Sequence, residues 1–200
     1  MVDLPTRIGA LTLANPVMPA SGTFGPELAQ VFDLDVLGAL VTKSITPEPR
    51  TGNPLPRLCE TEAGVLNSIG IPGKGLDHFC DVAMPEWRRF RAPLVVSLSA
   101  PSVASFAAAA ARLAATPGVA AIEANISCPN LEEDGRAFAV QADSTAAVTA
   151  AMRRATRVRR WIKLSPDTGD IAEVARAAEG AAASGRGSWR GVPGGGTPAA

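Results

Sequence analysis

The sequence has no excess of charge of either sign. Its 200 residues include 19 basic and 19 acidic side chains, so the formal net charge is zero. Proteins that bind nucleic acid or an anionic membrane through bulk charge carry a basic surface, which this composition does not supply. We therefore expect no nucleic-acid partner and no membrane partner.

Long apolar runs and secretion signals are also missing. No window reaches the roughly 18 uninterrupted apolar residues that cross a membrane, and residues 1–7 lack the basic start and apolar core of a signal peptide. The three cysteines are odd in number, and their spacing fits neither a disulfide framework nor a metal site. These absences predict a soluble, cytoplasmic protein with reduced thiols.

Histidine is almost absent, and this limits the possible chemistry. The single histidine, His78, lies in a segment of helical composition and has no orienting motif around it. A Cys/His pair for nucleophilic hydrolysis is therefore not expected. One histidine with scattered cysteines also cannot form an ordinary zinc site, so we expect no metal.

Short β-like runs alternate along the chain with alanine-rich helical segments, which is the pattern of βα units around a parallel sheet. A short hairpin is expected near residues 7–13. The expected strands are 16–20, 39–42, 94–98, 120–124 and 161–164, and the expected helices are 26–32, 75–91, 102–115, 144–157 and 170–183. Two long segments, 44–67 and 127–142, fit neither period and are expected to be functional loops.

Five βα units suit either an open doubly wound sheet or most of a closed barrel. No Gly-x-Gly-x-x-Gly motif follows the first strand, whereas polar residues follow several strands, and this favours a barrel. A complete (β/α)8 barrel usually needs about 250 residues. We therefore expect an α/β fold, an incomplete TIM-type barrel, over residues 1–180.

The Gly/Pro-rich residues 181–200 are expected to form a disordered tail that contains no sixth strand. This ending favours a truncated or frame-shifted reading of a longer gene. A single partial-barrel domain followed by this tail is the expected domain organisation.

Cys128 is the leading candidate for a reactive residue. It lies in the polar stretch 125–130, directly after the apolar run 119–124, where a strand is expected to end. An isolated cysteine is most often a buried structural thiol, but this one is expected in a loop. Its thiolate would suit a general base beside a redox cofactor.

Lysine is rare, and two of the three lysines follow β-like runs: Lys43 comes after residues 38–42, and Lys163 comes after Trp161 and Ile162. Lys43 and Lys163 would direct ammonium groups toward one end of the sheet, although each could instead extend from a strand end into solvent. Turn chemistry would explain any single asparagine. Amides near the same end would nevertheless suit a planar heterocycle with alternating C=O and N–H groups; these are Asn67, Asn125 and Asn130.

The order of the motifs resembles that of the class 1 dihydroorotate dehydrogenases, over about residues 4–180. The resemblance rests on Asn15–Gly25, Lys43–Thr46, Gly52–Arg57, Leu66–Ile71, Asn125–Asn130 and Ile162–Pro166. It implies a cytosolic flavin enzyme of pyrimidine synthesis that is built on an eightfold barrel.

The resemblance also implies roles for individual residues. FMN would contact Ala20, Ser21, Lys43, Ser44, Ser97, Asn125 and Lys163, with Ser97 at a position that is often asparagine in the family. Dihydroorotate would contact Lys43, Asn67, Ser68, Ile69, Gly70, Ile71, Asn125 and Asn130. Cys128 would remove the C5 proton while hydride leaves C6 for the flavin, and the products would be orotate and reduced FMN.

Partners and alternatives follow from the same resemblance. It implies a homodimer, and the acidic residues of the 127–142 loop favour the NAD-linked branch, which recruits an iron-sulfur flavin subunit. A related pyrimidine-reducing dehydrogenase is an alternative that Asn130 fits less well. An inactive fragment is another alternative, because no counterpart of the family's glycine-rich phosphate loops follows Gly180.

Overall fold

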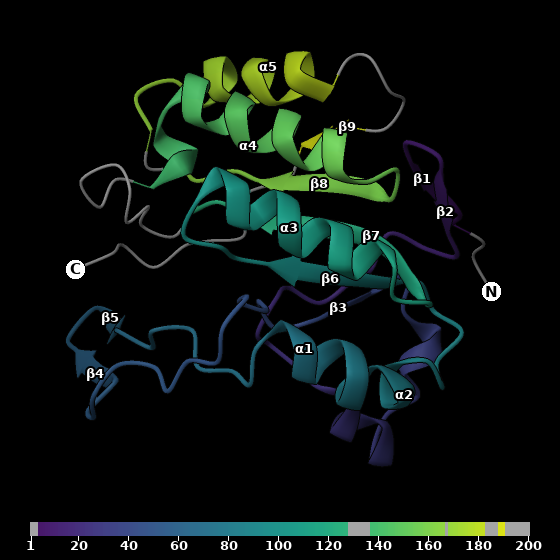
Figure 1. Cartoon of the computed structure of the whole chain (residues 1–200). Helices are drawn as coiled ribbons and strands as arrows, with labels where there is room; N and C mark the ends of the chain where they lie inside the picture. The colour runs from purple at the N-terminus through teal and green to yellow at the C-terminus, as the bar shows by residue number, and fades with distance from the viewer. Residues whose placement is uncertain (1–3, 128–136, 167, 183–187, 191–200) are drawn as a thin grey trace.

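A parallel sheet forms the centre of the computed structural model, which describes residues 4–127, 137–166, 168–182 and 188–190 (Figure 1). The five described strands of this sheet have the order β3-β6-β7-β8-β9, and all their pairings are parallel. Their bounds are β3 Leu40–Val41, β6 Leu94–Leu98, β7 Val119–Asn125, β8 Arg159–Lys163 and β9 Ser188–Arg190. This arrangement confirms the predicted α/β fold, a partial (β/α)8 barrel.

Three long helices cover one face of the sheet (Figure 1): α3 Val103–Ala114, α4 Ala142–Ala155 and α5 Ile171–Ala182. Helix α3 begins where the Ser102 hydroxyl accepts a hydrogen bond from the Ser105 backbone N–H at 3.1 Å. Its buried residues Phe106, Ala109, Ala110 and Leu113 recur at helical spacing. They pack against apolar strand residues in the larger of the two hydrophobic cores.

A second, smaller core lies on the opposite face of the sheet. The N-terminal hairpin, β1 Thr6–Ile8 and β2 Leu11–Leu13, contributes Ile8, Leu11 and Leu13 to this core. The sheet contributes residues that include Val95, Ala121 and Trp161. In a closed barrel this face would point inward. The hairpin covers the part of the face near the strand starts and does not cover the C-terminal ends of the strands.

Helices α1 and α2 lie below the sheet in Figure 1, on the side of β3. Helix α1 Leu76–His78 continues through a π-helical turn, Phe79–Ala83, into α2 Met84–Trp87. The described 3-10 turns are Pro26–Gln30, Leu34–Val36 and Phe138–Val140. No described helix is long and apolar enough to cross a membrane.

Three sequence-based predictions differ from the structure. Residues 16–20 form no strand, because Pro16 and Pro19 have no N–H to donate to a ladder. The expected loop 44–67 contains an antiparallel hairpin, β4 Leu58–Thr61 and β5 Gly64–Asn67. Residues 188–190 lie in the expected tail, yet they form strand β9 beside β8, because an open parallel edge offers backbone partners to even a short segment.

Candidate functional site

Polar side chains gather where the parallel strands end. The strand register pairs Ser97 with Glu123 and Asn125 with Lys163. Because side chains alternate between faces along a strand, these four residues share one face of the sheet. The same face carries Val95 and Ala121 nearer the strand starts, where they belong to the smaller core. This face therefore changes from apolar to polar toward the C-terminal ends of its strands, which is where barrel enzymes build their sites.

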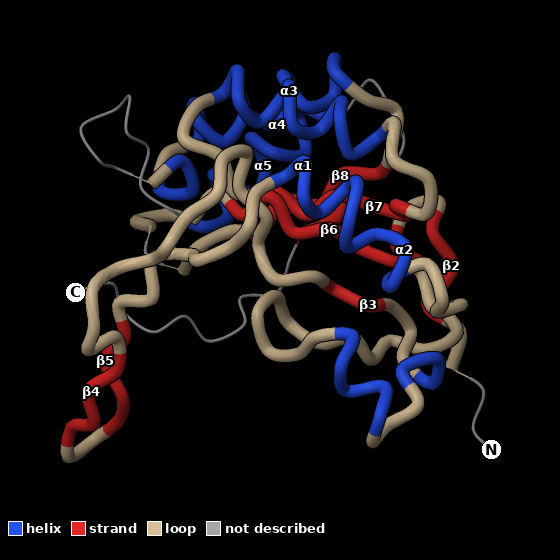
Figure 2. The backbone as a smooth tube through the Cα atoms, turned by 60° about the horizontal axis from the view of Figure 1, so that its bottom comes forward, coloured by secondary structure: helices blue, strands red, loops and turns tan. Residues whose placement is uncertain are grey.

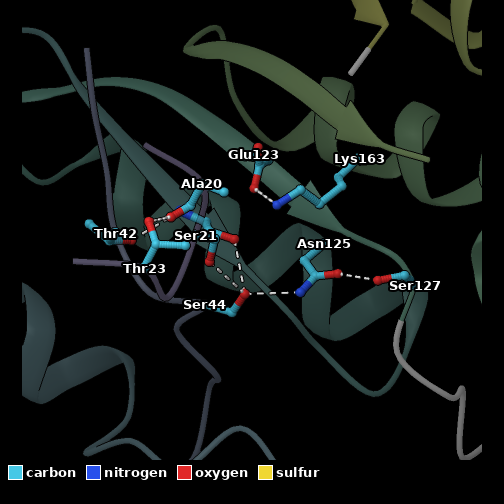
Figure 3. Close-up of polar contacts among 10 residues, drawn as sticks. Ala20, Ser21, Thr23, Thr42, Ser44, Glu123, Asn125, Ser127 and Lys163 are labelled. Atoms are coloured by element: carbon cyan, nitrogen blue, oxygen red, sulfur yellow. Dashed lines mark hydrogen bonds and ion pairs between the residues drawn. The ribbon is translucent and has the colours of Figure 1, made fainter. Parts of the chain in front are cut away.

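The Ser44 hydroxyl is the centre of a hydrogen-bond network at this edge (Figure 3). Its Oγ lies 3.0 Å from Ser97 Oγ and 3.3 Å from Ser21 Oγ. It also accepts a 2.9 Å hydrogen bond from Asn125 Nδ2. A hydroxyl has one donor, so Ser44 donates to only one of the two neighbouring serines at a time. The network joins segments that are more than 20 and more than 80 residues apart in sequence.

Both ends of the Asn125 amide are engaged. While Nδ2 donates to Ser44, Oδ1 accepts a 2.7 Å hydrogen bond from the exposed Ser127 hydroxyl. Ser97 is fully buried, and its backbone N–H donates to the Thr42 hydroxyl at 3.1 Å. The hydrogen bonds to Ser44 and Ser127 give the Asn125 amide a defined orientation at the rim of the sheet.

Lys163 forms an ion pair with Glu123 on the same face (Figure 3), with Nζ 3.0 Å from Oε1. The glutamate side chain is 12 % exposed and the lysine side chain is 29 % exposed, so the ammonium group lies nearer solvent than the carboxylate. Among the described residues, Lys163 is the ion-pair partner of this carboxylate.

The loop around Ala20 and the exposed Lys43 complete this side of the site. The Ala20 carbonyl accepts hydrogen bonds from the backbone N–H and hydroxyl of Thr23, at 3.2 and 2.7 Å, which closes a tight turn. Lys43 and Ser44 line a pocket of about 180 Å³. Its other walls come from the turn at residues 72–75 and from helical residues that include His78 and Phe79.

The predicted substrate segment, residues 67–71, lies at the end of the β4–β5 hairpin and in the turn that follows. Figures 1 and 2 show this hairpin projecting from the body of the molecule, on the side where the sheet strands end. Ser68 accepts a 2.6 Å hydrogen bond from Asn53 Nδ2, and the Gly70 carbonyl accepts one from Arg50 Nε at 3.2 Å. These contacts hold the segment to the preceding loop, and the chain returns to the Lys43 pocket only at Pro72.

The structure thus gathers part of the predicted site. Ser21, Ser44, Ser97 and Asn125 are joined by hydrogen bonds, and Lys163 lies beside Asn125 in the strand register. Cys128 and Asn130 lie outside the described residues, so their predicted roles stay predictions. Among the described residues, no group of histidine, cysteine, aspartate and glutamate side chains could hold a metal ion.

Comparison with known proteins shows the family to which the chain belongs. The family model for dihydroorotate dehydrogenase matches residues 3–185. The chain belongs to the dihydroorotate dehydrogenase family. The class 1 resemblance predicted from the motif order is confirmed by this match and by the relatives below.

The relatives with the name "Dihydroorotate dehydrogenase B (NAD(+)), catalytic subunit" include the following three proteins. The protein from Desulforamulus reducens is 44% identical over 92% of this chain and 61% of its own length. The Desulforudis audaxviator protein is 47% identical over 91% of this chain and 60% of its own length. A Listeria monocytogenes protein is 40% identical over 92% of this chain and 62% of its own length. The chain therefore spans about three fifths of the length of these relatives.

Two residues of the candidate site are not predicted from the sequence. Thr42 lies at the end of an expected strand, and Glu123 lies within an otherwise apolar run. Glu123 did carry a signal, because it is the one acidic residue in the five described strands of the parallel sheet. A carboxylate in such a strand needs a cationic or hydrogen-bonding partner.

Proposed function

We propose that this chain carries the flavin-binding and substrate-binding face of an enzyme that oxidises dihydroorotate to orotate in pyrimidine biosynthesis. One observation carries the proposal: the Ser44-centred network and the Lys163–Glu123 pair lie together at the C-terminal edge of a parallel sheet, in a chain of this family. The hydroxyl, amide and ammonium groups there suit a flat ring with carbonyl and N–H groups along its edge.

FMN fits this set of donors and acceptors. The residues that would hold its ring system are Ala20, Ser21, Lys43, Ser44, Ser97, Asn125 and Lys163. When bound, FMN would supply the acceptor for the hydride that leaves C6 of dihydroorotate. Lys163 would place positive charge beside the ring, and the serine hydroxyls with the Asn125 amide would orient it.

The substrate would lie against the same edge. Lys43 would pair with its carboxylate, and its polar ring edge would contact Asn125, Asn130 and the segment Asn67, Ser68, Ile69, Gly70 and Ile71. We propose Cys128 as the general base, whose thiolate takes the C5 proton as the C5–C6 double bond forms. The substrate thus loses one proton to Cys128 and one hydride to FMN, which together account for the two hydrogens removed in forming orotate.

Protein partners are part of the proposal. The relatives are named as the catalytic subunit of an NAD(+)-dependent enzyme, and this name supports a second subunit that carries electrons from the flavin toward NAD(+). An iron-sulfur flavin protein would suit this task. We further propose that the catalytic chain forms a homodimer.

A flavin titration with anaerobic reduction tests the proposal. The purified chain is expected to bind FMN with a defined stoichiometry, and dihydroorotate is expected to bleach the bound flavin without oxygen. Cys128→Ser is expected to slow bleaching at least about 100-fold, because general-base catalysis contributes about that much or more. Cys59→Ser, at an exposed thiol, is the matched control and is expected to bleach at the wild-type rate.

Two results would contradict the proposal. Absence of FMN binding at high flavin concentration would reject a flavin-binding function for this chain. Normal bleaching by Cys128→Ser would reject the assigned base and leave flavin binding intact.

A further inference from the structure

We propose that Glu123 is a positioning residue, which holds the Lys163 ammonium group at the sheet edge and offsets part of its charge. This inference rests on the proposed flavin function. It assigns to Glu123 two tasks: fixing where the positive charge beside the ring lies, and limiting how strongly that charge favours the reduced ring.

The position of Glu123 is unusual for a carboxylate. It lies on β7, between the hydrogen-bonded strands β6 and β8, and is 9 % exposed. Its register partner on β8 is the buried Trp161, and Ala121 lies two residues earlier on the same face. An apolar residue at position 123 would continue this packing. Because removing a carboxylate from water is costly, and a buried ion pair often stabilises a fold no better than apolar packing, stability alone does not account for Glu123.

The geometry indicates that Glu123 acts on Lys163. A lysine side chain has four rotatable bonds, so its strand position alone leaves the ammonium group poorly located. The Glu123 carboxylate lies 3.0 Å from the Lys163 ammonium group and is less exposed, so it holds the positive charge from the side nearer the sheet. An ammonium group has three N–H donors, so those that do not face the carboxylate stay available to a ligand on the open side of the sheet.

The pair also sets the electrostatic field that a ligand meets. A lone ammonium group would strongly favour added negative charge on the ring, as occurs on reduction, and the neighbouring carboxylate opposes that preference. Glu123→Gln keeps the size of the side chain and removes its charge. The variant is therefore expected to bind reduced FMN more tightly relative to oxidised FMN than the wild type does.

The first experiment measures the two-electron midpoint potential of bound FMN. Glu123→Gln is expected to raise the potential by about 30 mV, which corresponds to a tenfold change in relative affinity for a two-electron couple. Glu123→Asp keeps the charge and is expected to stay within about 10 mV of the wild type, about a twofold change. The control Glu173→Gln, at an exposed position on α5, is expected to leave the potential unchanged.

The second experiment needs no flavin. Because the chain has only three lysines, reductive methylation followed by peptide mass analysis measures each of them separately. In the apo chain, Glu123→Gln is expected to increase the labelling rate of Lys163 at least threefold. Lys43 and Lys74 are exposed internal references whose rates should not change. General loosening of the fold would also lower the free energy of unfolding in urea. Measuring that free energy beside the labelling rate therefore separates positioning from a structural effect.

The outcomes separate the two proposals. If wild-type chain binds no FMN, the proposed function fails, and the labelling experiment still tests the pair. If FMN binds but Glu123→Gln lowers the potential or raises it by less than about 10 mV, which is about a twofold change in relative affinity, Glu123 does not offset the Lys163 charge. An unchanged Lys163 labelling rate would reject the positioning role. If Glu123→Gln does not fold, Glu123→Ala carries the labelling test, because it also removes the carboxylate that faces Lys163.

Discussion

At the scale of single residues, the Ser44 hydroxyl has the largest number of recorded side-chain partners at the site. It meets two other serine hydroxyls and the Asn125 amide, and one of those serines, Ser97, is fully buried. A buried hydroxyl that loses its partner stays removed from water without a compensating hydrogen bond, and this destabilises the folded state. Ser44 therefore contributes both to stability and to the orientation of the groups assigned to the flavin.

Replacing Ser44 by alanine tests this double role. Ser44→Ala is expected to lower the free energy of unfolding by about 1–2 kcal/mol, because Ser97 and Asn125 each lose a hydrogen-bond partner. FMN affinity should fall as well. Urea denaturation and flavin titration measure the two effects. The control Thr12→Ala, at an exposed position with no recorded side-chain hydrogen bond, should stay within about 0.5 kcal/mol of the wild type.

At the scale of elements, Asp35 joins the 3-10 turn Leu34–Val36 to the segment that leads into β6. Its Oδ1 accepts hydrogen bonds from the backbone N–H groups of Arg91 and Ala92, at 2.6 and 3.0 Å. The Ala92 N–H is the main cause that lowers the pKa of Asp35 below its ordinary value of 3.8; burial opposes it, and Arg91 adds to the lowering. The ionised carboxylate is thus the form that stabilises this junction.

The lowered pKa predicts a pH-dependent effect of removing the charge. Because the pKa of Asp35 is lower in the folded state, its ionised carboxylate stabilises the fold at pH values above the ordinary pKa of 3.8. This stabilisation is lost as the pH falls through the pKa of the folded state. Asp35→Asn is therefore expected to cost about 1–2 kcal/mol at pH 7, and progressively less as the pH falls below 3.8. Urea unfolding at pH 7 and at pH 3 measures this difference. If Asp35→Asn cost the same unfolding free energy at both pH values, ionisation of Asp35 would not be involved. The control is Glu62→Gln, which lies in the exposed hairpin turn.

At the scale of the whole molecule, the sheet separates two hydrophobic cores. The helices pack on one face, and the N-terminal hairpin packs on the other through residues that include Leu13, which is 1 % exposed. The site lies beyond the hairpin-covered core, at the strand ends. Docking of the hairpin therefore supports the strands that carry Ser97, Asn125 and Lys163.

Truncating Leu13 tests whether the hairpin is part of the cooperative fold. Leu13→Ala is expected to cost about 2–5 kcal/mol, because it removes a fully buried side chain and leaves a cavity. Leu4→Ala, at a side chain that is 54 % exposed, is the matched control and should cost far less. Denaturant midpoints measure both variants. A cost for Leu13→Ala no larger than that of the control would contradict docking of the hairpin onto the sheet.

The elements that the sequence predicted well are those with a long, regular pattern. Helices α3, α4 and α5 and strands β6, β7 and β8 lie within a few residues of their predicted ranges. Hairpin β4–β5 was missed because all eight of its residues are exposed, so it has no buried face to give an alternating apolar pattern. Residues 16–20 were wrongly predicted as a strand, because their apolar character outweighed the two prolines.

The order of the βα units, the resemblance to the family and the residue types at the strand ends can all be read from the sequence, because periodicity and motifs are local properties of a chain. Which of these groups meet depends on the three-dimensional fold. Parallel pairing sets Asn125 beside Lys163 and brings Ser44 and Ser97 into contact across neighbouring segments. The Glu123–Lys163 pair arises in the same way, because strand register sets the distance between groups that are far apart along the chain.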